Sequence, residues 1–207
     1  MLYYETIDTS TLELLKRLLA IPSFSSLRLA GGTSLALQYG HRKSIDIDLF
    51  GEIDIDGDSL SSILTETGEV KRLNNRPNIH IYTINGVKVD IVNYPYRWID
   101  ELLVKDGLRL ASDKDISAMK LAAITGRGTK KDFIDLFELL QHYSLSELIG
   151  FYEQKYHDGS VFLVLKSLVY FEDADAEITP YLLRNYSWED IKTYIKKVHV
   201  GYMKNIG

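Results

Sequence analysis

Two aspartates in one short apolar stretch are the residues of this sequence best suited to chemistry. Asp46 and Asp48 alternate with Ile45, Ile47 and Leu49, as polar and apolar residues do in a half-buried strand. Their Cα atoms are therefore expected ~6.5–7 Å apart on one face of the strand. Carboxylates at this spacing repel each other unless a cation lies between them, and hard oxygen ligands suit Mg²⁺. The alternative is a polar strand edge that faces solvent.

A third aspartate, Asp90, lies in a run of valines and isoleucines. In a strand over Val87–Asn93, Lys88, Asp90 and Val92 share one face. An aspartate in such a run is costly unless it is exposed at an edge or has a charged partner. We therefore predict that Asp90 joins the first two aspartates as a third carboxylate if the two strands pack side by side. An edge-exposed aspartate is the alternative.

Two neighbouring segments carry groups that suit phosphates. Gly31-Gly32-Thr33-Ser34 comes after a short strand and before a helix, where glycines let backbone N–H groups approach a phosphate. Arg42-Lys43-Ser44 precedes the aspartate pair and supplies cationic donors. A plain turn for the first segment and a solvated charged loop for the second are the alternatives.

Periodicity separates the chain into two halves. The first half is expected to mix short strands with short helices, whereas the second half is helical almost throughout from Ser112. Asn85-Gly86 predicts a type I′ hairpin turn between strands 79–84 and 87–93. The other expected elements are a helix over 11–20, strands over 27–30 and 45–50, a helix over 59–67 capped by Asp58, a run from 158 to 171 capped by Asp158, and capping boxes at Ser144–Glu147 and Ser187–Asp190.

Composition limits the class of protein. The 207 residues carry a formal net charge of −5 and no cysteine, which excludes disulfides, thiolate zinc sites and cysteine nucleophiles. The chain start has no secretory signal pattern, and no apolar run approaches the ~20 residues of a membrane helix. We expect a cytoplasmic α/β protein with a small mixed sheet, divided into a core over 1–110 and a helical region over 111–207 that closes the cleft.

The motifs in combination resemble a known superfamily. Leu29-Ala-Gly-Gly-Thr-Ser-Leu-Ala-Leu37 and His41-Arg-Lys-Ser-Ile-Asp-Ile-Asp-Leu-Phe50 resemble nucleotidyltransferases with DNA polymerase β-like folds. More narrowly, the chain resembles the AbiEii/AbiGii abortive-infection toxin family. The segments Asp115–Arg127 and Lys131–Phe137 are similar to the downstream Lys…Arg…Lys-Asp-x-x-Asp-Leu signature of that family. The resemblance extends over about residues 27–200.

The resemblance implies a transferase that uses an NTP and two Mg²⁺ ions. It implies a metal site of Asp46, Asp48 and Asp90, with Lys120 and Asp132 as further catalytic positions. The groups expected to bind the nucleotide are Gly31, Gly32, Thr33, Ser34, Arg42, Ser44, Lys120 and Arg127. Without the resemblance, Lys120 would be a surface lysine, Asp132 a helix-capping partner of Thr129, and Arg127 a residue that stabilises a helix end.

The resemblance also implies partners. The acceptor hydroxyl is expected on RNA, such as a tRNA 3′ end, or on a protein, and a separate antitoxin is expected because relatives act in toxin–antitoxin or abortive-infection systems. Two other functions stay open. One is a small-molecule nucleotidyltransferase with an aminoglycoside-like acceptor, and the other is a non-catalytic nucleotide-binding module of the same fold.

Overall fold

The computed structural model describes residues 1–206, which fall into two compact units. Unit 1 comprises Met1–Tyr96 and Leu102–Ala111. Unit 2 comprises Arg97–Glu101 and the described residues from Ser112 onward. The domain boundary expected after Leu110 and the closure of a cleft by the second region stay predictions.

Unit 1 is built around one mixed sheet. Its strands are β1 (Arg28–Leu29), β2 (Ile47–Gly51), β3 (Val70–Arg76), β4 (Ile79–Ile84), β5 (Val87–Asn93), β6 (Leu103–Lys105) and β7 (Leu108–Leu110). Its helices are α1 (Thr9–Ala20), α2 (Gly31–Tyr39) and α3 (Gly57–Leu64), with short 3₁₀ turns at Tyr4–Thr6, Pro22–Phe24 and Thr65–Thr67. Within the described residues the strand order is β3-β4-β5-β2-β1-β7-β6.

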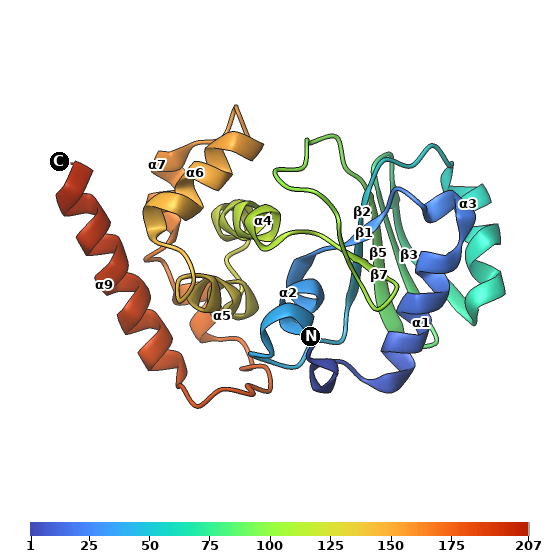
Figure 1. The fold of residues 1–207 in the computed structure, drawn as a ribbon, viewed down its shortest axis with the longest axis horizontal. Coiled ribbons are helices and arrows are strands. Elements are labelled where there is room, and N and C mark those ends of the chain that lie inside the picture. Colours follow the sequence, from blue (N-terminus) through green and yellow to red (C-terminus); the bar gives the residue numbers. More distant parts are fainter. Residues whose placement is uncertain (207) are drawn as a thin grey trace. The chain divides into compact units, whose positions relative to one another are not determined.

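The two faces of this sheet differ in character. Ile47, Leu49, Val89 and Ile91 are fully buried in the hydrophobic core, which leucines of α1 and α3 complete. Figure 1 shows α1 and α3 on one side of the sheet and α2 on the other. Because side chains alternate along a strand, the residues between these four lie on the face that α2 covers. Asp48 is one of them.

Most of the local predictions for unit 1 are confirmed. β4 and β5 form the expected hairpin, and Asn85 and Gly86 have positive φ values of 50° and 82°. The cap of α3 was predicted wrongly, because the Asp56 side chain, and not that of Asp58, accepts hydrogen bonds from backbone N–H groups. β3, β6 and β7 were not predicted, because their polar or very short segments lack a clear alternation.

Unit 2 is helical among its described residues. Its helices are α4 (Asp113–Gly126), α5 (Lys130–Leu139), α6 (Leu145–Lys155), α7 (Val161–Ser167), α8 (Glu172–Asp175) and α9 (Trp188–Ile206). The reciprocal hydrogen bonds of both predicted capping boxes are present, but Ser160, and not Asp158, caps α7. No helix in residues 1–206 is long and apolar enough to cross a membrane.

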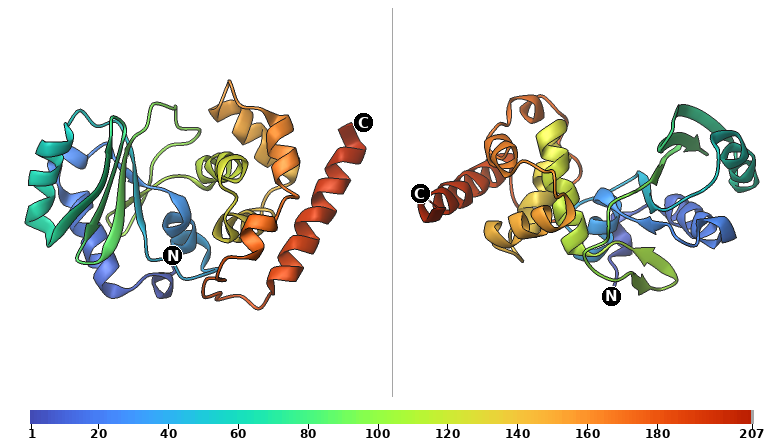
Figure 2. Two further views of the ribbon diagram at one scale, coloured as in Figure 1. Left: turned by 180° about the vertical axis from the view of Figure 1, so that it is seen from behind. Right: turned by 90° about the horizontal axis from the view of Figure 1, so that it is seen from above.

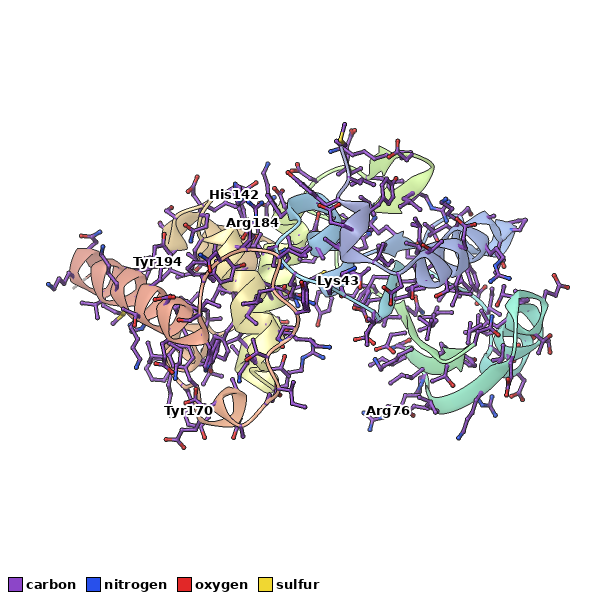
Figure 3. All side chains as sticks on the ribbon, turned by 90° about the horizontal axis from the view of Figure 1, so that it is seen from below. Lys43, Arg76, His142, Tyr170, Arg184 and Tyr194 are labelled. Atoms are coloured by element: carbon purple, nitrogen blue, oxygen red, sulfur yellow. The ribbon has the colours of Figure 1, made fainter. Side chains whose placement is uncertain are left out.

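The helix α9 packs along α5 and α6 (Figure 2). Tyr194 of α9, labelled in Figure 3, has its ring centroid 5.2 Å from that of Phe137 in α5, in an edge-to-face arrangement. Its hydroxyl donates to the Leu140 carbonyl oxygen over 3.3 Å. Aromatic contacts of this geometry stabilise a packed helix pair beyond the area they bury.

A fully buried ion pair holds the segment Arg97–Glu101 to the rest of unit 2. Lys155 Nζ lies 2.6 Å from Asp115 Oδ1, and both side chains have no exposed surface. The ammonium also donates to the Arg97 carbonyl oxygen, and Asp115 accepts from the backbone N–H groups of Ile99 and Asp100. These bonds satisfy the two buried charges, as burial requires.

We predict that Lys155→Met destabilises the protein by roughly 3–5 kcal/mol, because the substitution leaves the Asp115 carboxylate buried without its cation. Chemical denaturation with a tertiary-structure probe measures the change. Lys166→Met, at an exposed lysine of α7, is the matched control and is expected to have little effect. Equal unfolding midpoints for the two variants would contradict the prediction.

Candidate active site

The strand register brings Asp48 and Asp90 together. β2 and β5 are parallel neighbours, and Asp48 is paired directly with Asp90. Residues paired in this way on adjacent strands lie on the same face, and neighbouring strands are ~4.8 Å apart. The two aspartates are half-buried, whereas the residues on either side of each point into the core. The predicted juxtaposition of the two segments is thus present in the fold.

Gly31 lies against the Asp48 carboxylate. The Gly31 backbone has a φ of +64°, and a Cβ atom at this position would overlap Asp48 Oδ2 and lie 3.1 Å from Asp48 Cγ. The Ala30 N–H donates to the Asp48 carbonyl oxygen over 2.9 Å, which ties the start of α2 to β2. No side chain caps α2 at Ala30. The helix N-terminus therefore begins directly beside the carboxylate.

The hydroxyl groups near this helix start bind other protein groups. Thr33 Oγ1 is 2.7 Å from Ser44 Oγ and also donates to the Asp46 carbonyl oxygen. Ser34 Oγ accepts from Gln38 Nε2 over 3.2 Å. All three hydroxyl-bearing residues are buried. The segment thus fixes the entry to β2, and the contacts of Thr33, Ser34 and Ser44 with a nucleotide stay predictions.

Asp46 lies one residue before β2 and is half-buried. The expected alternation does not extend to the start of the predicted strand, because Ile45 is 57% exposed and not in the core. Within residues 1–206 no group of three or more His, Cys, Asp or Glu side chains is arranged to hold a metal ion. The metal site of Asp46, Asp48 and Asp90 therefore stays a prediction.

The two oxygen atoms of the Asp90 carboxylate differ in their hydrogen bonding. Oδ2 accepts from Lys88 Nζ over 2.6 Å, so Asp90 has a charged partner. Oδ1 is buried and has no hydrogen-bond partner among the described residues. A buried carboxylate oxygen without a donor is costly. A cation bound there would remove this cost, so the donor set beside Asp48 fits a divalent ion.

The charged segment after α2 is less accessible to a ligand than the sequence predicts. Arg42 is only 2% exposed, and its Nη1 donates to the Lys43 carbonyl oxygen over 2.9 Å. Lys43, labelled in Figure 3, is half-buried in the segment that joins α2 to β2. The Arg42 guanidinium thus supports local structure, and its contact with a nucleotide stays a prediction.

In unit 2, Lys120 lies between two carboxylates. Lys120 Nζ is 2.9 Å from Asp132 Oδ1 and 2.6 Å from Asp135 Oδ2. Lys120 is 5% exposed, so the alternative of a surface lysine is wrong. The two aspartates lie on α5 and are at most 1% exposed. The predicted roles of Lys120 and Asp132 in catalysis stay predictions.

Asp132 takes part both in the N-terminal cap of α5 and in ion pairs. Its backbone N–H donates to Thr129 Oγ1, and its Oδ2 accepts from the same hydroxyl over 2.7 Å. Its carboxylate also accepts two hydrogen bonds from the Arg127 guanidinium, whose side chain is 66% exposed. Burial raises the pKa of Asp132, but Lys120 and Arg127 outweigh burial and hold it well below its usual range.

Asp135 belongs to the Lys-Asp-x-x-Asp-Leu signature, but it was given no role in the predicted site. This aspartate is fully buried and forms one of the two ion pairs of Lys120. The signal was present, because Asp132 and Asp135 are three residues apart and share one helix face. Two acidic residues on a helix face otherwise rich in Phe and Leu indicate a buried cation.

Comparison with known proteins assigns the chain to a family. Residues 13–177 match the model of the family described as nucleotidyl transferase AbiEii toxin, type IV toxin–antitoxin system. An uncharacterized protein of Aquifex aeolicus (strain VF5) is 34% identical over 203 residues, which cover 93% of this chain and 96% of that protein.

Solved structures show the same fold. The nucleotidyltransferase toxin MenT4 from Mycobacterium tuberculosis H37Rv superposes with a TM-score of 0.60 at 15% identity, over 91% of this chain and 80% of that one. JHP933 from Helicobacter pylori superposes with a TM-score of 0.56 at 19% identity, over 96% of each chain. The predicted α/β fold, with its mixed sheet and helical C-terminal region, is confirmed as a nucleotidyltransferase fold.

We predict that Gly31→Ala displaces the Asp48 carboxylate. The added methyl group overlaps Asp48 Oδ2, and the positive φ costs about 1–2 kcal/mol of unfolding free energy. Gly107→Ala is the matched control, because Gly107 has a φ of +78° and open space around its Cβ position. We expect both variants to lose similar stability in denaturant unfolding and only Gly31→Ala to lose nucleotidyl transfer. Equal transfer by both variants would contradict the prediction.

We predict that Asp132→Asn lowers the unfolding free energy by roughly 3 kcal/mol at pH 7, the low end for a broken buried pair because Asp135 still contacts Lys120. A depressed pKa contributes stability above the unfolded-state value of about 3.9 that is lost as the pH falls. The difference between wild type and variant should therefore shrink below about pH 4. Denaturant titrations at several pH values measure it.

Asp190→Asn is the matched control for this comparison. Asp190 occupies the same position of a capping box in α9, where Ser187 is its partner, and it is exposed. Its loss should be limited to a cap, about 1 kcal/mol. A loss at Asp132 no larger than that at Asp190 would show that the buried ion pairs contribute nothing to stability.

Proposed function

The chain belongs to the AbiEii family of nucleotidyl transferase toxins, and it is a nucleotidyltransferase. From this premise we propose that unit 1 transfers a nucleotide from an NTP to an acceptor hydroxyl, with divalent metal ions held by Asp46, Asp48 and Asp90. The observation that carries the proposal is the pairing of Asp48 with Asp90 on parallel strands, next to the helix start at Gly31.

Two features of unit 1 support a triphosphate as the donor. The start of α2 has no side-chain cap, and an uncapped helix N-terminus favours an anion through its free N–H groups and its partial positive charge. Gly31 lets the backbone come within contact of the Asp48 carboxylate. A phosphate bound at the helix start would thus lie beside the carboxylate that we assign to the metal.

In this mechanism Asp46, Asp48 and Asp90 would hold the divalent ions, whose charge would stabilise the leaving pyrophosphate and make the acceptor hydroxyl more acidic. Groups of the chain itself would orient the phosphates and accept the proton. Gly31 and Gly32 orient the phosphates through their backbone N–H groups. Asp90 would accept the proton of the acceptor hydroxyl in this scheme. The acceptor oxygen forms a bond to the α-phosphorus while the bond from that phosphorus to the bridging oxygen breaks, and pyrophosphate leaves.

We propose RNA as the acceptor class, such as the 3′ end of a tRNA, because membership of a toxin family favours a cellular macromolecule over an antibiotic. We also propose a separate antitoxin as the biological partner, since the family belongs to type IV toxin–antitoxin systems. The roles of Lys120 and Arg127 in binding the nucleotide stay predictions. A protein acceptor and an aminoglycoside acceptor are the outcomes that would replace RNA.

We predict that Asp48→Asn and Asp90→Asn each reduce transfer at least about 100-fold, because each variant loses a charge that the metal ions require. The assay incubates the protein with each α-labelled NTP, Mg²⁺ and total RNA, and then measures label in RNA. Chelation of divalent ions with EDTA should abolish transfer as completely as Asp48→Asn does.

Asp54→Asn, at an exposed aspartate of the same unit, is the matched control and should transfer at the wild-type rate. Unfolding midpoints close to wild type would show that the active-site variants are folded. Parallel incubations with protein and with aminoglycosides identify the acceptor class. Full transfer by Asp48→Asn would refute the metal assignment.

A further inference from the structure

Lys88 and Asp90 form an ion pair on the carboxylate-bearing face of the sheet. They are two residues apart on β5 and therefore point to the same side. Lys88 Nζ lies 2.6 Å from Asp90 Oδ2, and the side chains are 43% and 20% exposed. Val89 between them is fully buried on the opposite face. The ion pair thus lies on the same face as Asp48, at the edge of the proposed metal site.

The lysine contacts only one of the two oxygens of the Asp90 carboxylate. Asp90 Oδ2 accepts from the ammonium, while Oδ1 is buried and lacks a hydrogen-bond partner among the described residues. The Asp48 side chain is the register neighbour of Asp90 and shares its sign of charge. Like charges on adjacent strands destabilise each other, so the Lys88 ammonium compensates a repulsion that the register creates.

A divalent cation at Asp90 would have to contend with this ammonium. Two cations on one carboxylate repel each other strongly at separations of a few ångströms in a partly buried site. The long, half-exposed Lys88 side chain can move away from Asp90 without disturbing the core, because its stem is not packed on the buried face. The lysine is therefore a displaceable counter-ion, unlike Lys120 of unit 2, which is 5% exposed.

We propose that Lys88 competes with a divalent cation for Asp90 and so sets the affinity of the second metal position. The inference rests on the proposed function, because it takes Asp90 as a metal ligand. Lys88 is a positioning residue in this scheme: it holds the Asp90 carboxylate beside Asp48 and releases it when a cation of higher charge binds.

The test measures Mn²⁺ binding to the full chain without nucleotide, by electron paramagnetic resonance of the free ion. Lys88→Met removes the competing charge and should tighten Mn²⁺ binding roughly three- to tenfold, as expected for a partly exposed ion pair. Lys88→Arg keeps the charge and should bind Mn²⁺ about as wild type does. Lys71→Met, at an exposed lysine of β3, is the matched control.

A double-mutant cycle separates the two proposals. In the Asp90→Asn background the effect of Lys88→Met should disappear, since no carboxylate is left to compete for. Unchanged or weaker Mn²⁺ binding by Lys88→Met, together with weaker binding by Asp48→Asn, would overturn the role of Lys88 and leave the metal assignment standing. Unchanged Mn²⁺ binding by both Asp48→Asn and Asp90→Asn would overturn the metal assignment itself.

Discussion

The parallel register of β2 and β5 is the constraint on which the site depends. A slip of one residue would place a core residue of β5 beside Asp48 and turn Asp90 toward the hydrophobic core. That slip is opposed by the burial of the apolar residues that flank both aspartates, Ile47 and Leu49 on one strand and Val89 and Ile91 on the other. The hydrophobic face therefore fixes where the charges lie on the opposite face. Folding energy and active-site geometry come from the same strand pairing.

Gly31 extends this constraint from the sheet to a helix. The Ala30 N–H binds the Asp48 carbonyl oxygen, so the start of α2 follows the position of β2. Because Gly31 has no side chain, its backbone reaches the Asp48 carboxylate itself. Thr33, two residues after Gly31 in the same first turn of α2, donates its hydroxyl to the Asp46 carbonyl oxygen. One helix start thus contacts the backbone of both aspartates of the first segment.

Local signals in the sequence predicted local structure well. Asn85-Gly86 predicted the hairpin, and Ser144 with Glu147 predicted the start of α6, because each signal depends only on residues close in the chain.

Pairings between distant segments were harder to predict from the sequence. Neither segment carries a sequence pattern that predicts the parallel pairing of Leu29 with Leu110. The burial of Lys120 depends on Asp135, fifteen residues away on another helix, so the sequence alone favoured a lysine at a surface or cleft. Sequence reasoning therefore identified Lys120 and Asp132 but not the second ion pair, between Lys120 and Asp135.

The difference in charge compensation between the units bears on where a metal could bind. In unit 2, Asp132 accepts from Lys120, Arg127 and Thr129, so both of its oxygens have donors. A cation offered to that carboxylate would have to replace several charge-assisted bonds. In unit 1, Asp90 has one lysine that is half exposed and one buried oxygen without a donor. An added cation there gains a ligand at the cost of a single displaceable contact. Of these two carboxylates, only Asp90 has binding capacity left for an external ion, which supports the proposed position of the metal on the sheet.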